Sequence, residues 1–286
     1  MTIKTFVNAL IMRTIKKIKS ELVMNNDVKG IVQVFEEMSA RKMKDIREGI
    51  LVGRAFLERL TVLSGDIGAD LAQAEPRTLK KASVYLSSAA GLFGDLPEKV
   101  FSLFLSSIKG TDADVFVIGK EGAIYMKNTA PRMSFKLIDM PDSELPADSL
   151  SAISNYLAGY SSISVFYGRF KNLVNQEAVL GKLSGQIISE SINKDEKEML
   201  VKRAKYIYEP TIEAVSAKFR NEILAVLIEG MARENQLAKY GSRLMHLDSA
   251  YDNIEKSLEK LGFEFRRESK KMEDKKQIER VSRLIA

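Results

Sequence analysis

Large apolar side chains recur along the last third of the chain in alternating steps of three and four residues. In the stretch 237–265 they follow this spacing without a break, at Leu237, Tyr240, Leu244, Leu247, Tyr251, Ile254, Leu258, Leu261 and Phe265. This heptad spacing places them in one seam along a helix, and a seam of this length packs against another helix. The sequence therefore predicts a coiled coil.

The helical pattern around the seam begins after YIYEP (206–210) and lasts to the end of the chain. Proline suits the first turn of a helix, because its missing N–H would lack an intrahelical partner there. We expect one helix over 211–286, about 110 Å long at 1.5 Å per residue. Three glycines, each costing roughly 1 kcal/mol relative to alanine, indicate that it is packed against other elements: Gly230, Gly241 and Gly262.

The first part of the chain is helical too, up to about residue 60, where SGDIGAD and then Pro76 break the pattern. Charged stretches such as EEMSARKMKD (36–45) lie between apolar positions three or four apart. The predicted apolar face consists of Ile15, Ile18, Leu22, Val28, Val32, Phe35, Met38, Met43, Ile46 and Ile50. This helix is the expected partner of the C-terminal seam, because no other predicted element has a comparable length.

The middle of the chain alternates strands and helices. Short runs rich in β-branched and aromatic residues predict strands, at KASVYLSS (81–88), DVFVIG (114–119), MSFKLIDM (133–140) and SISVFYG (162–168). Helical stretches lie between them, at PEKVFSLFLSSI (97–108) and DSLSAISNYLAGY (148–160). This order favours an α/β layer with a largely parallel sheet.

Together these elements predict an α/β fold in which a Rossmann-like domain is inserted between two long helices. The insertion returns the chain to its start, which favours an antiparallel coiled coil, and a period of about 3.5 residues makes it left-handed. The expected domains are an N-terminal coiled-coil helix (1–76), an inserted α/β domain (77–205) and a C-terminal coiled-coil helix (206–286).

Composition and motifs argue against a catalytic, cofactor-binding or metal site in this chain. It has 286 residues, no cysteine and one histidine, which excludes disulfides and thiol catalysis and argues against zinc. His246 falls at heptad position c, outside the seam, so we expect it on the surface. The glycine-rich GLFGDLP (91–97) and IGKEG (118–122) lack the endings of phosphate-binding loops. Glu36 and Glu37 are expected to be solvated, and we predict no catalytic, cofactor-binding or metal site.

Charge and hydropathy limit the partners. The net charge of +6 suits an acidic partner surface or simply solubility, and the basic clusters have little aromatic interleaving for nucleic acid. No apolar stretch approaches the roughly 20 residues that a membrane span needs. The first twenty residues contain Lys and Arg but no acid; we interpret them as the basic start of a helix rather than a transit peptide.

Several motifs resemble those of one protein family. ENQLAKYGSRLMHLDSAYDN (234–253) is similar to a family element with a Glu-Asn start, an arginine before apolar residues and an Asp-Asn end. YEP (208–210), the Tyr-x-x-Phe-x-Asn-x-x-x-Gln pattern of FYGRFKNLVNQ (166–176) and GLFGDLP resemble other elements of the same family. The chain resembles the γ subunit of F-type ATP synthases, the central rotor shaft, over essentially its whole length. The matching residues include Tyr167, Phe170, Asn172, Gln176, Glu234, Asn235, Arg243, Asp252 and Asn253.

Some positions depart from the family pattern. Phe93 stands for the usual cysteine of the glycine-rich loop, Pro97 for its asparagine, and Arg267 for the glutamine that follows the arginine matched by Arg266. The N-terminal helix matches only loosely, at Lys29, Lys42 and Met43. The resemblance is therefore to a divergent member of the family.

The resemblance implies a non-catalytic rotor subunit without cofactors. Its coiled coil would stand inside a ring of α and β catalytic subunits, and its α/β domain would contact the ε subunit and the membrane c-ring. The chain would couple ion flow to ATP synthesis or hydrolysis. It would be peripheral to a bacterial inner membrane on the cytoplasmic face, or to the mitochondrial inner membrane on the matrix side. The expected partner-contact residues are Lys42, Met43, Arg243, Asp252, Asn253, Arg266 and Arg267.

Two other functions remain as alternatives. A coiled-coil scaffold or export-apparatus shaft would explain the long helices, but not the inserted domain. A nucleotide-binding enzyme would explain the α/β domain, but the sequence has no phosphate loop and no acid–base pair to support it.

Overall fold

The computed structural model describes residues 3–65, 80–87, 93–139, 147–184 and 209–285. These residues belong to two compact parts. The helical part comprises residues 1–39 and 244–286, and the α/β part comprises residues 40–243. Two long helices contribute to both parts: α1 (Ile3–Gly65) and α7 (Ile212–Ile285).

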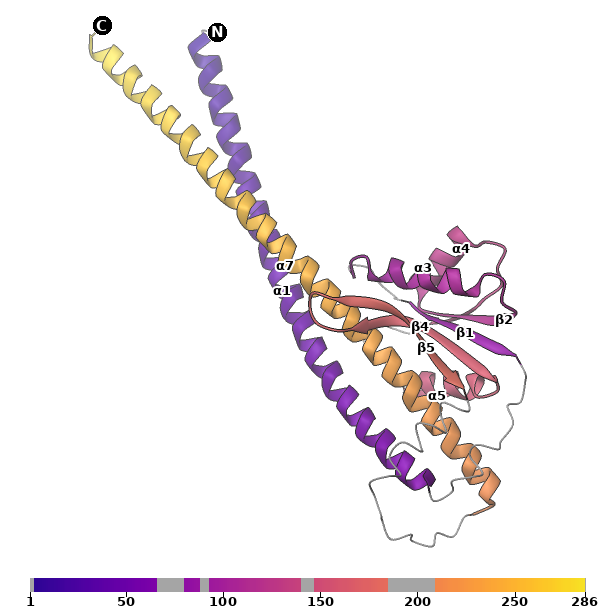
Figure 1. The fold of residues 1–286 in the computed structure, drawn as a ribbon. Helices are drawn as coiled ribbons and strands as arrows, with labels where there is room; N and C mark the ends of the chain where they lie inside the picture. Colours follow the sequence, from indigo (N-terminus) through magenta and orange to yellow (C-terminus); the bar gives the residue numbers. More distant parts are fainter. Residues whose placement is uncertain (1–2, 66–79, 88–92, 140–146, 185–208, 286) are drawn as a thin grey trace. The chain divides into compact units, whose positions relative to one another are not determined.

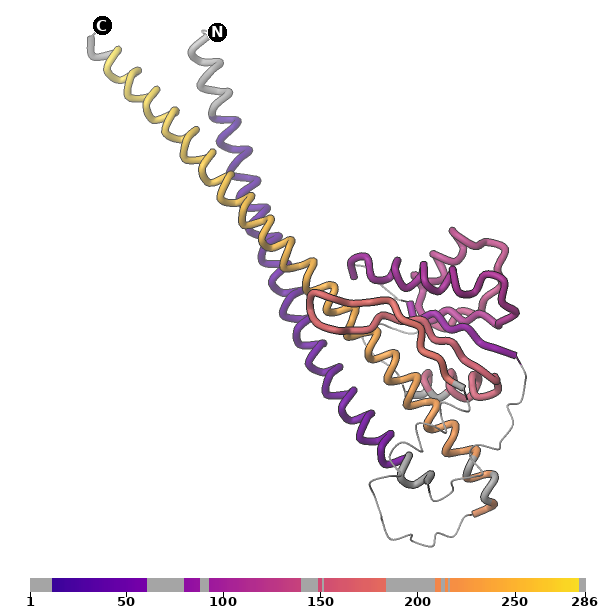
Figure 2. Tube along the Cα trace, in the orientation of Figure 1, coloured from indigo at the N-terminus to yellow at the C-terminus, as the bar shows by residue number. Residues whose placement is uncertain are grey.

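In the helical part, α1 and α7 run side by side in opposite directions (Figures 1 and 2). The Lys29 ammonium lies 2.7 Å from the Glu255 carboxylate and 4.7 Å from the centre of the Tyr251 ring. The predicted seam of α7 is half-buried at each position from Leu244 to Phe265, and half-buried residues continue at the same spacing to Glu279. This period of about 3.5 residues is that of a left-handed coiled coil, as the sequence predicts.

The predicted apolar face of α1 is wrong in its middle. Residues that face α7 repeat every three or four positions, and polar side chains hold several of these places: Asn25, Lys29, Glu36 and Ser39. Val28, Phe35 and Met38, which the prediction placed in the seam, are 40%, 39% and 56% exposed. Glu36 is also a correction, because it is half-buried rather than solvated, whereas Glu37 is exposed. The prediction is wrong here because α1 has a second apolar stripe on its outer face, with the same helical spacing.

The α/β part contains a mixed five-stranded sheet with the order β3-β2-β1-β4-β5. Strands β1 (Lys81–Leu86), β2 (Ala113–Ile118), β3 (Lys136–Ile138) and β4 (Ser162–Phe170) are parallel, and β5 (Gln176–Ser184) pairs antiparallel with β4. The four parallel strands confirm the sequence prediction. Strand β5 was missed, because Gly181 and alternating charges make QEAVLGKLS a weak strand signal.

Helices cover both faces of the sheet (Figure 1). α3 (Leu96–Ile108) and α4 (Lys120–Thr129) lie on one face, and α5 (Ala147–Leu157) lies on the other. The first core is aromatic and contains Tyr85, Phe104 and Phe166, while the second includes residues of α5 and of α7 such as Ile228. α3 and α5 were predicted and α4 was not. The predicted domain boundaries at residues 76 and 205 lie outside the described residues.

The coiled coil of the α/β part pairs the end of α1 with the start of α7. Leu60 and Ile223 form a buried contact there, supported by Leu57 and Phe219. α7 therefore packs against α1 on one side and against the sheet on another. This double packing accounts for Gly241, where a Cβ atom would lie 2.8 Å from the Phe170 ring.

Candidate functional site: the joint between α7 and the sheet

The segment 235–242 of α7 is buried at every residue. A helix that packs on only one side buries a stripe, so burial on all sides means that protein surrounds this turn of the helix. The segment contains polar residues that the burial would penalise unless they are hydrogen-bonded: Asn235, Gln236, Lys239 and Ser242.

Two of these polar residues, Asn235 and Lys239, bind main-chain groups at the ends of β1 and β4. Asn235 Oδ1 accepts a hydrogen bond from the Gly168 N–H in β4 (2.8 Å), and its Nδ2 donates to the carbonyl of Leu86 in β1 (3.2 Å). The Lys239 ammonium donates to the carbonyl of Ser87 (2.6 Å). α7 is thus attached to the carboxyl ends of two neighbouring parallel strands.

This attachment lies at the edge of the sheet where open α/β folds bind their ligands. The chain leaves β1 toward β2 on one side and returns to β4 on the other, so the order of the strands reverses at β1. Open α/β sheets bind their ligands in the crevice at the carboxyl ends of the strands at such a point. Asn235 and Lys239 fill that crevice here. We call this attachment of residues 235–242 to β1 and β4 the joint.

Two glycines allow the close approach. A Cβ atom at Gly168 would lie 3.3 Å from Asn235 Oδ1 and 3.3 Å from the Ala238 Cβ. A Cβ atom at Gly241 would lie 2.8 Å from the Phe170 ring, which is closer than real Cβ contacts. Larger side chains at these positions would push α7 away from β4.

Phe93 packs against α7 at the C-terminal end of the joint. Ser242 Oγ donates to the Phe93 carbonyl (2.8 Å), and the Arg243 guanidinium lies 4.4 Å from the centre of the Phe93 ring. Lys239 is 5.6 Å from the same ring, and Tyr240 meets it edge-on at 6.1 Å. Cations close to an aromatic face are stabilised by its electrons. The described end of the glycine-rich loop therefore holds α7.

The β4–β5 hairpin is shaped by its own polar side chains. Asn172 Oδ1 accepts hydrogen bonds from the N–H groups of Val174 and Asn175 (3.1 and 2.7 Å). Gln176 Nε2 donates to the carbonyls of Asn172 and Leu173 (3.0 and 2.6 Å). The turn holds Phe170 against α7, and the Arg47 guanidinium of α1 lies 5.5 Å from the centre of its ring.

Comparisons with known proteins agree with this architecture. A model of the ATP synthase family matches residues 14–271 of the chain. The chain belongs to the ATP synthase family. Among curated relatives, an ATP synthase gamma chain of Vesicomyosocius okutanii is 27% identical and covers 83% of this chain and 86% of its own length. One of Ruthia magnifica is 25% identical, with coverages of 86% and 90%.

Solved structures share the fold of this ATP synthase family member. A chain from the Euglena gracilis mitochondrial ATP synthase, in a structure of OSCP, F1 and c-ring, superposes with a TM-score of 0.62 at 12% identity and covers 95% of this chain and 94% of its own. A chain from the Tetrahymena thermophila mitochondrial ATP synthase central stalk and c-ring gives 0.56 at 17% identity, with coverages of 77% and 99%. The structural likeness supports the predicted fold class.

The motif residues of this family member divide between the joint and the surface. Asn235, Phe170, Asn172 and Gln176 build the joint and its hairpin, and Arg243 lies against Phe93. Of the other predicted contact residues, Met43 is 5% exposed within its own chain and Lys42 is half-buried. The remaining four are exposed in the helical part: Asp252, Asn253, Arg266 and Arg267. Their contact with a partner stays a prediction.

Lys239, Gly168 and Gly241 were not predicted from the sequence as parts of a site. A signal was present, because no acidic residue occurs between Glu234 and Asp248, which is unusual for a helix with solvated faces. His246 is exposed, as predicted. Among the described residues, no group of three or more His, Cys, Asp or Glu side chains is placed to hold a metal ion. No helix in the described ranges is long and apolar enough to cross a membrane.

Proposed function

We propose that this chain is the γ-type central shaft of a rotary ATP synthase. It is a non-catalytic rotor subunit that couples ion flow through a membrane sector to ATP synthesis or hydrolysis in a ring of α and β subunits. Membership of the ATP synthase family and the relatives named gamma chain support this assignment.

The observation that carries the mechanism is the joint. Asn235 and Lys239 fix the α/β domain to α7 through main-chain groups, and α7 then continues without interruption to Ile285. A twist applied to the domain is passed directly to the helix, because no loop lies between the two. The α/β domain is therefore suited to receive torque and the coiled coil to deliver it.

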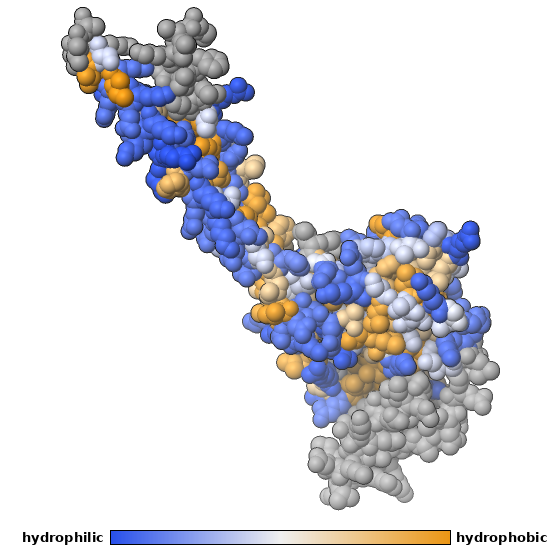
Figure 3. Space-filling model, turned by 45° about the horizontal axis from the view of Figure 1, so that its top comes forward, coloured by the Kyte–Doolittle hydropathy of each residue, from blue (hydrophilic) through white to orange (hydrophobic). Residues whose placement is uncertain are grey.

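The ring is the proposed partner of the helical part. α1 exposes a stripe of large apolar side chains there, spaced by three and four residues: Met24, Val28, Ile31, Phe35 and Met38. Figure 3 shows apolar side chains along one flank of the helical part, with hydrophilic side chains over much of the rest of the visible face. Exposed apolar surface of this kind marks interaction sites. A shaft with one apolar flank would contact each catalytic subunit differently as it turns, and so would shift its conformational equilibrium.

The remaining proposed contacts are made by the α/β domain. The α/β domain would bind the ε subunit and the c-ring, and the chain would be peripheral to the membrane through that contact. We place it on the cytoplasmic face of a bacterial inner membrane, or on the matrix face of a mitochondrial inner membrane. The filled crevice supports a non-catalytic role, because a substrate would have to displace α7.

Co-expression with α and β subunits tests the proposal. The expected complex contains one copy of this chain for three α/β pairs, and its ATP hydrolysis drives rotation of a bead attached to the α/β domain. A coiled-coil scaffold or export-apparatus shaft would copurify in another ratio, or would bind without rotating. Rotation that persists after deletion of residues 244–286 would also contradict the shaft function.

A further inference from the structure

A cavity of about 550 Å³ lies within the α/β part, between α1, α7 and the β4–β5 hairpin. α1 lines it with residues 47–57, α7 with residues 226–237, and the hairpin with Phe170. Small-molecule sites in proteins have volumes of roughly 300–1,000 Å³ and are mostly apolar with a few polar groups. The cavity meets both criteria. It adjoins the joint at Leu237 and Phe170, but Asn235 and Lys239, which make the hydrogen bonds of the joint to the sheet, do not line it.

Two glycines keep the cavity open. A Cβ atom at Gly53 of α1 or at Gly230 of α7 would meet nothing within 4 Å. Gly49 is different, because a Cβ atom there would lie 2.3 Å from the Arg233 guanidinium. Glycine destabilises the interior of a helix relative to alanine. Among the described residues, close packing does not account for Gly53 or Gly230, and their shared effect is the space between the helices.

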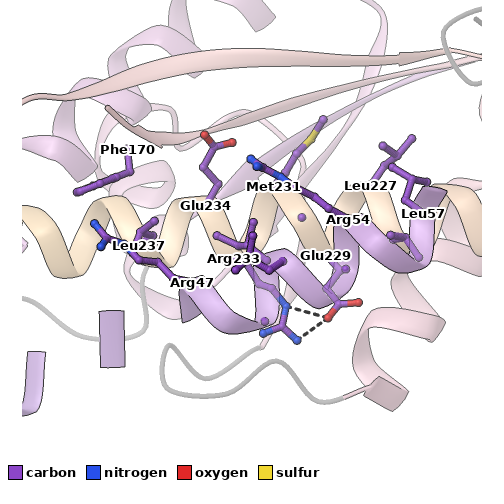
Figure 4. A pocket seen from close by; sticks show the side chains of 16 residues that line it. Arg47, Arg54, Leu57, Phe170, Leu227, Glu229, Met231, Arg233, Glu234 and Leu237 are labelled. Atoms are coloured by element: carbon purple, nitrogen blue, oxygen red, sulfur yellow. Dashed lines mark hydrogen bonds and ion pairs between the residues drawn. The ribbon is translucent and has the colours of Figure 1, made fainter. Parts of the chain in front are cut away.

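The charges around the cavity favour an anion. Glu229 is paired with Arg233 at 2.6 Å, and Glu234 lies 3.8 Å from Arg169. In the view of Figure 4 the Glu229–Arg233 pair lies below α7, and Phe170, Glu234 and Met231 lie above it. Within the part of the chain that the structure describes, Arg47 and Arg54 line the cavity without an ion pair.

We propose that this cavity binds a small amphipathic organic anion. Arg47 and Arg54 would hold its acidic head group, and Phe170, Leu57 and Met231 would contact its apolar body. A free small molecule fits better than a bilayer lipid, because two helices and a hairpin line a space of only about 550 Å³. The ligand would contact α1 and α7 together, so its binding would stabilise their pairing in proportion to its occupancy.

The binding test uses the purified full-length chain and the fluorescent amphipathic anion 8-anilinonaphthalene-1-sulfonate. The chain has no tryptophan, so the emission of the probe is read without interference from protein indoles. We expect one saturable class of site from which decanoate displaces the probe. Decanol, which has the same alkyl length and no charge, should compete far less. Equal competition by decanol would refute the anionic character of the site.

Filling the cavity provides the structural control. The double variant Gly53→Leu/Gly230→Leu should lose the saturable binding while it gains thermal stability from better helix formers, so unfolding cannot explain the loss. The matched control Gly30→Leu/Gly262→Leu changes one glycine on each helix where a Cβ atom also meets nothing within 4 Å. It should bind normally. Unchanged binding in the filled variant would refute the proposed location.

Removing the charge tests the head-group contact. Arg54→Met keeps most of the side-chain volume and should weaken decanoate binding about tenfold, since hydrogen bonds to charged groups are the stronger ones. Arg41→Met, at an exposed arginine of α1 outside the cavity, should leave it unchanged. If the chain binds the probe alone but not in complex with α and β subunits, a partner segment occupies the cavity and the small-molecule proposal fails.

Discussion

Helix α7 is buried in two different ways along its length. In the α/β part, residues 235–242 are buried one after another, on all sides of the helix. In the helical part, positions such as Tyr251 and Ile254 are half-buried in a seam, while Asp252 and Asn253 between them are exposed. One helix is therefore an internal element in one part of the molecule and a surface element in the other.

The polar side chains of the two segments have different tasks. Asn235, Lys239 and Ser242 satisfy main-chain groups of the sheet and the loop, so their loss would leave buried donors and acceptors unpaired. Most polar residues of the helical part are instead exposed, as at Asp252 and Asn253, and a few such as Ser39 face the seam. The joint holds α7 against the sheet, whereas the outer faces of the helical part are exposed and can contact a partner.

Replacing the central residue of the joint should have the largest effect. Asn235→Leu leaves the Gly168 N–H and the Leu86 carbonyl without their partners. Each buried unsatisfied group costs about 1–3 kcal/mol, so we expect a loss of about 2–6 kcal/mol. Urea unfolding of the full chain measures it. Asn253→Leu, at an exposed asparagine of the same helix, is the matched control and should change the stability little. If both variants lowered the stability equally, Asn235 in the joint would be no more important for the fold than the exposed Asn253.

Overpacking the joint should have a smaller but clear effect. Gly241→Leu places a side chain against the Phe170 ring, and forced overpacking costs about 1–3 kcal/mol, partly offset by about 1 kcal/mol of helix propensity. Gly262→Leu, which meets nothing within 4 Å, should instead stabilise the chain. The two melting temperatures should therefore move in opposite directions. A shift in the same direction would mean that α7 can move away from β4 at little cost.

The contrast also explains what the sequence could predict. The seam of α7 and the four parallel strands were predictable, because their periodicity depends only on contacts within the chain. The face of α1 that packs against α7 could not be predicted in the middle of that helix. Val28, Phe35 and Met38 have the spacing of an internal face but lie on the outside, and spacing cannot tell the surface that meets α7 from one that meets another protein.

The joint was only partly predictable. Asn235 was recognised through the family resemblance, yet its role depends on Gly168 and Leu86, which are far away in the sequence. Lys239 falls at the same heptad position as His246, since the two are seven residues apart. One of them is buried and the other is exposed, so the heptad position alone carries no information once a helix enters a domain.

The half-buried carboxyl of the seam should make stability depend on pH. Partial burial, and secondarily the charge of Asp248, raise the pKa of Glu36 above its ordinary value of 4.5. Below the unfolded-state value both states are protonated and no penalty exists. As the pH rises through the raised folded-state pKa, the folded chain must ionise a disfavoured carboxyl and loses stability. Glu36→Gln should therefore raise the melting temperature at pH 7 but not at pH 4.

The exposed neighbour provides the control for this pH effect. Glu37→Gln removes the same charge from a solvated position and should show no comparable gain. A melting-temperature gain in Glu36→Gln that is as large at pH 4 as at pH 7 would show that charge in the seam is not the cause.

The smallest effect is expected at the exposed arginines near the end of α7. Arg266 and Arg267 are exposed, and Arg267 Nε lies 3.4 Å from the carboxylate of its neighbour Glu268. If they meet acidic loops of the ring, each pair contributes only about 0.2–1 kcal/mol. The double alanine variant should therefore reduce ion pumping per ATP hydrolysed only in part. Replacing the exposed residues Lys256 and Lys260 together removes the same charge from the same helix and serves as the control.

Salt distinguishes a charged contact from a packing defect. Screening acts over about 8–10 Å at physiological ionic strength, so high salt should weaken coupling in the parent complex toward the level of the arginine variant. The variant itself should respond less to salt. Pumping and hydrolysis are measured side by side in reconstituted vesicles at low and high ionic strength. An unchanged ratio in the arginine variant under both conditions would mean that these side chains are solvated and that the apolar flank of α1 alone meets the ring.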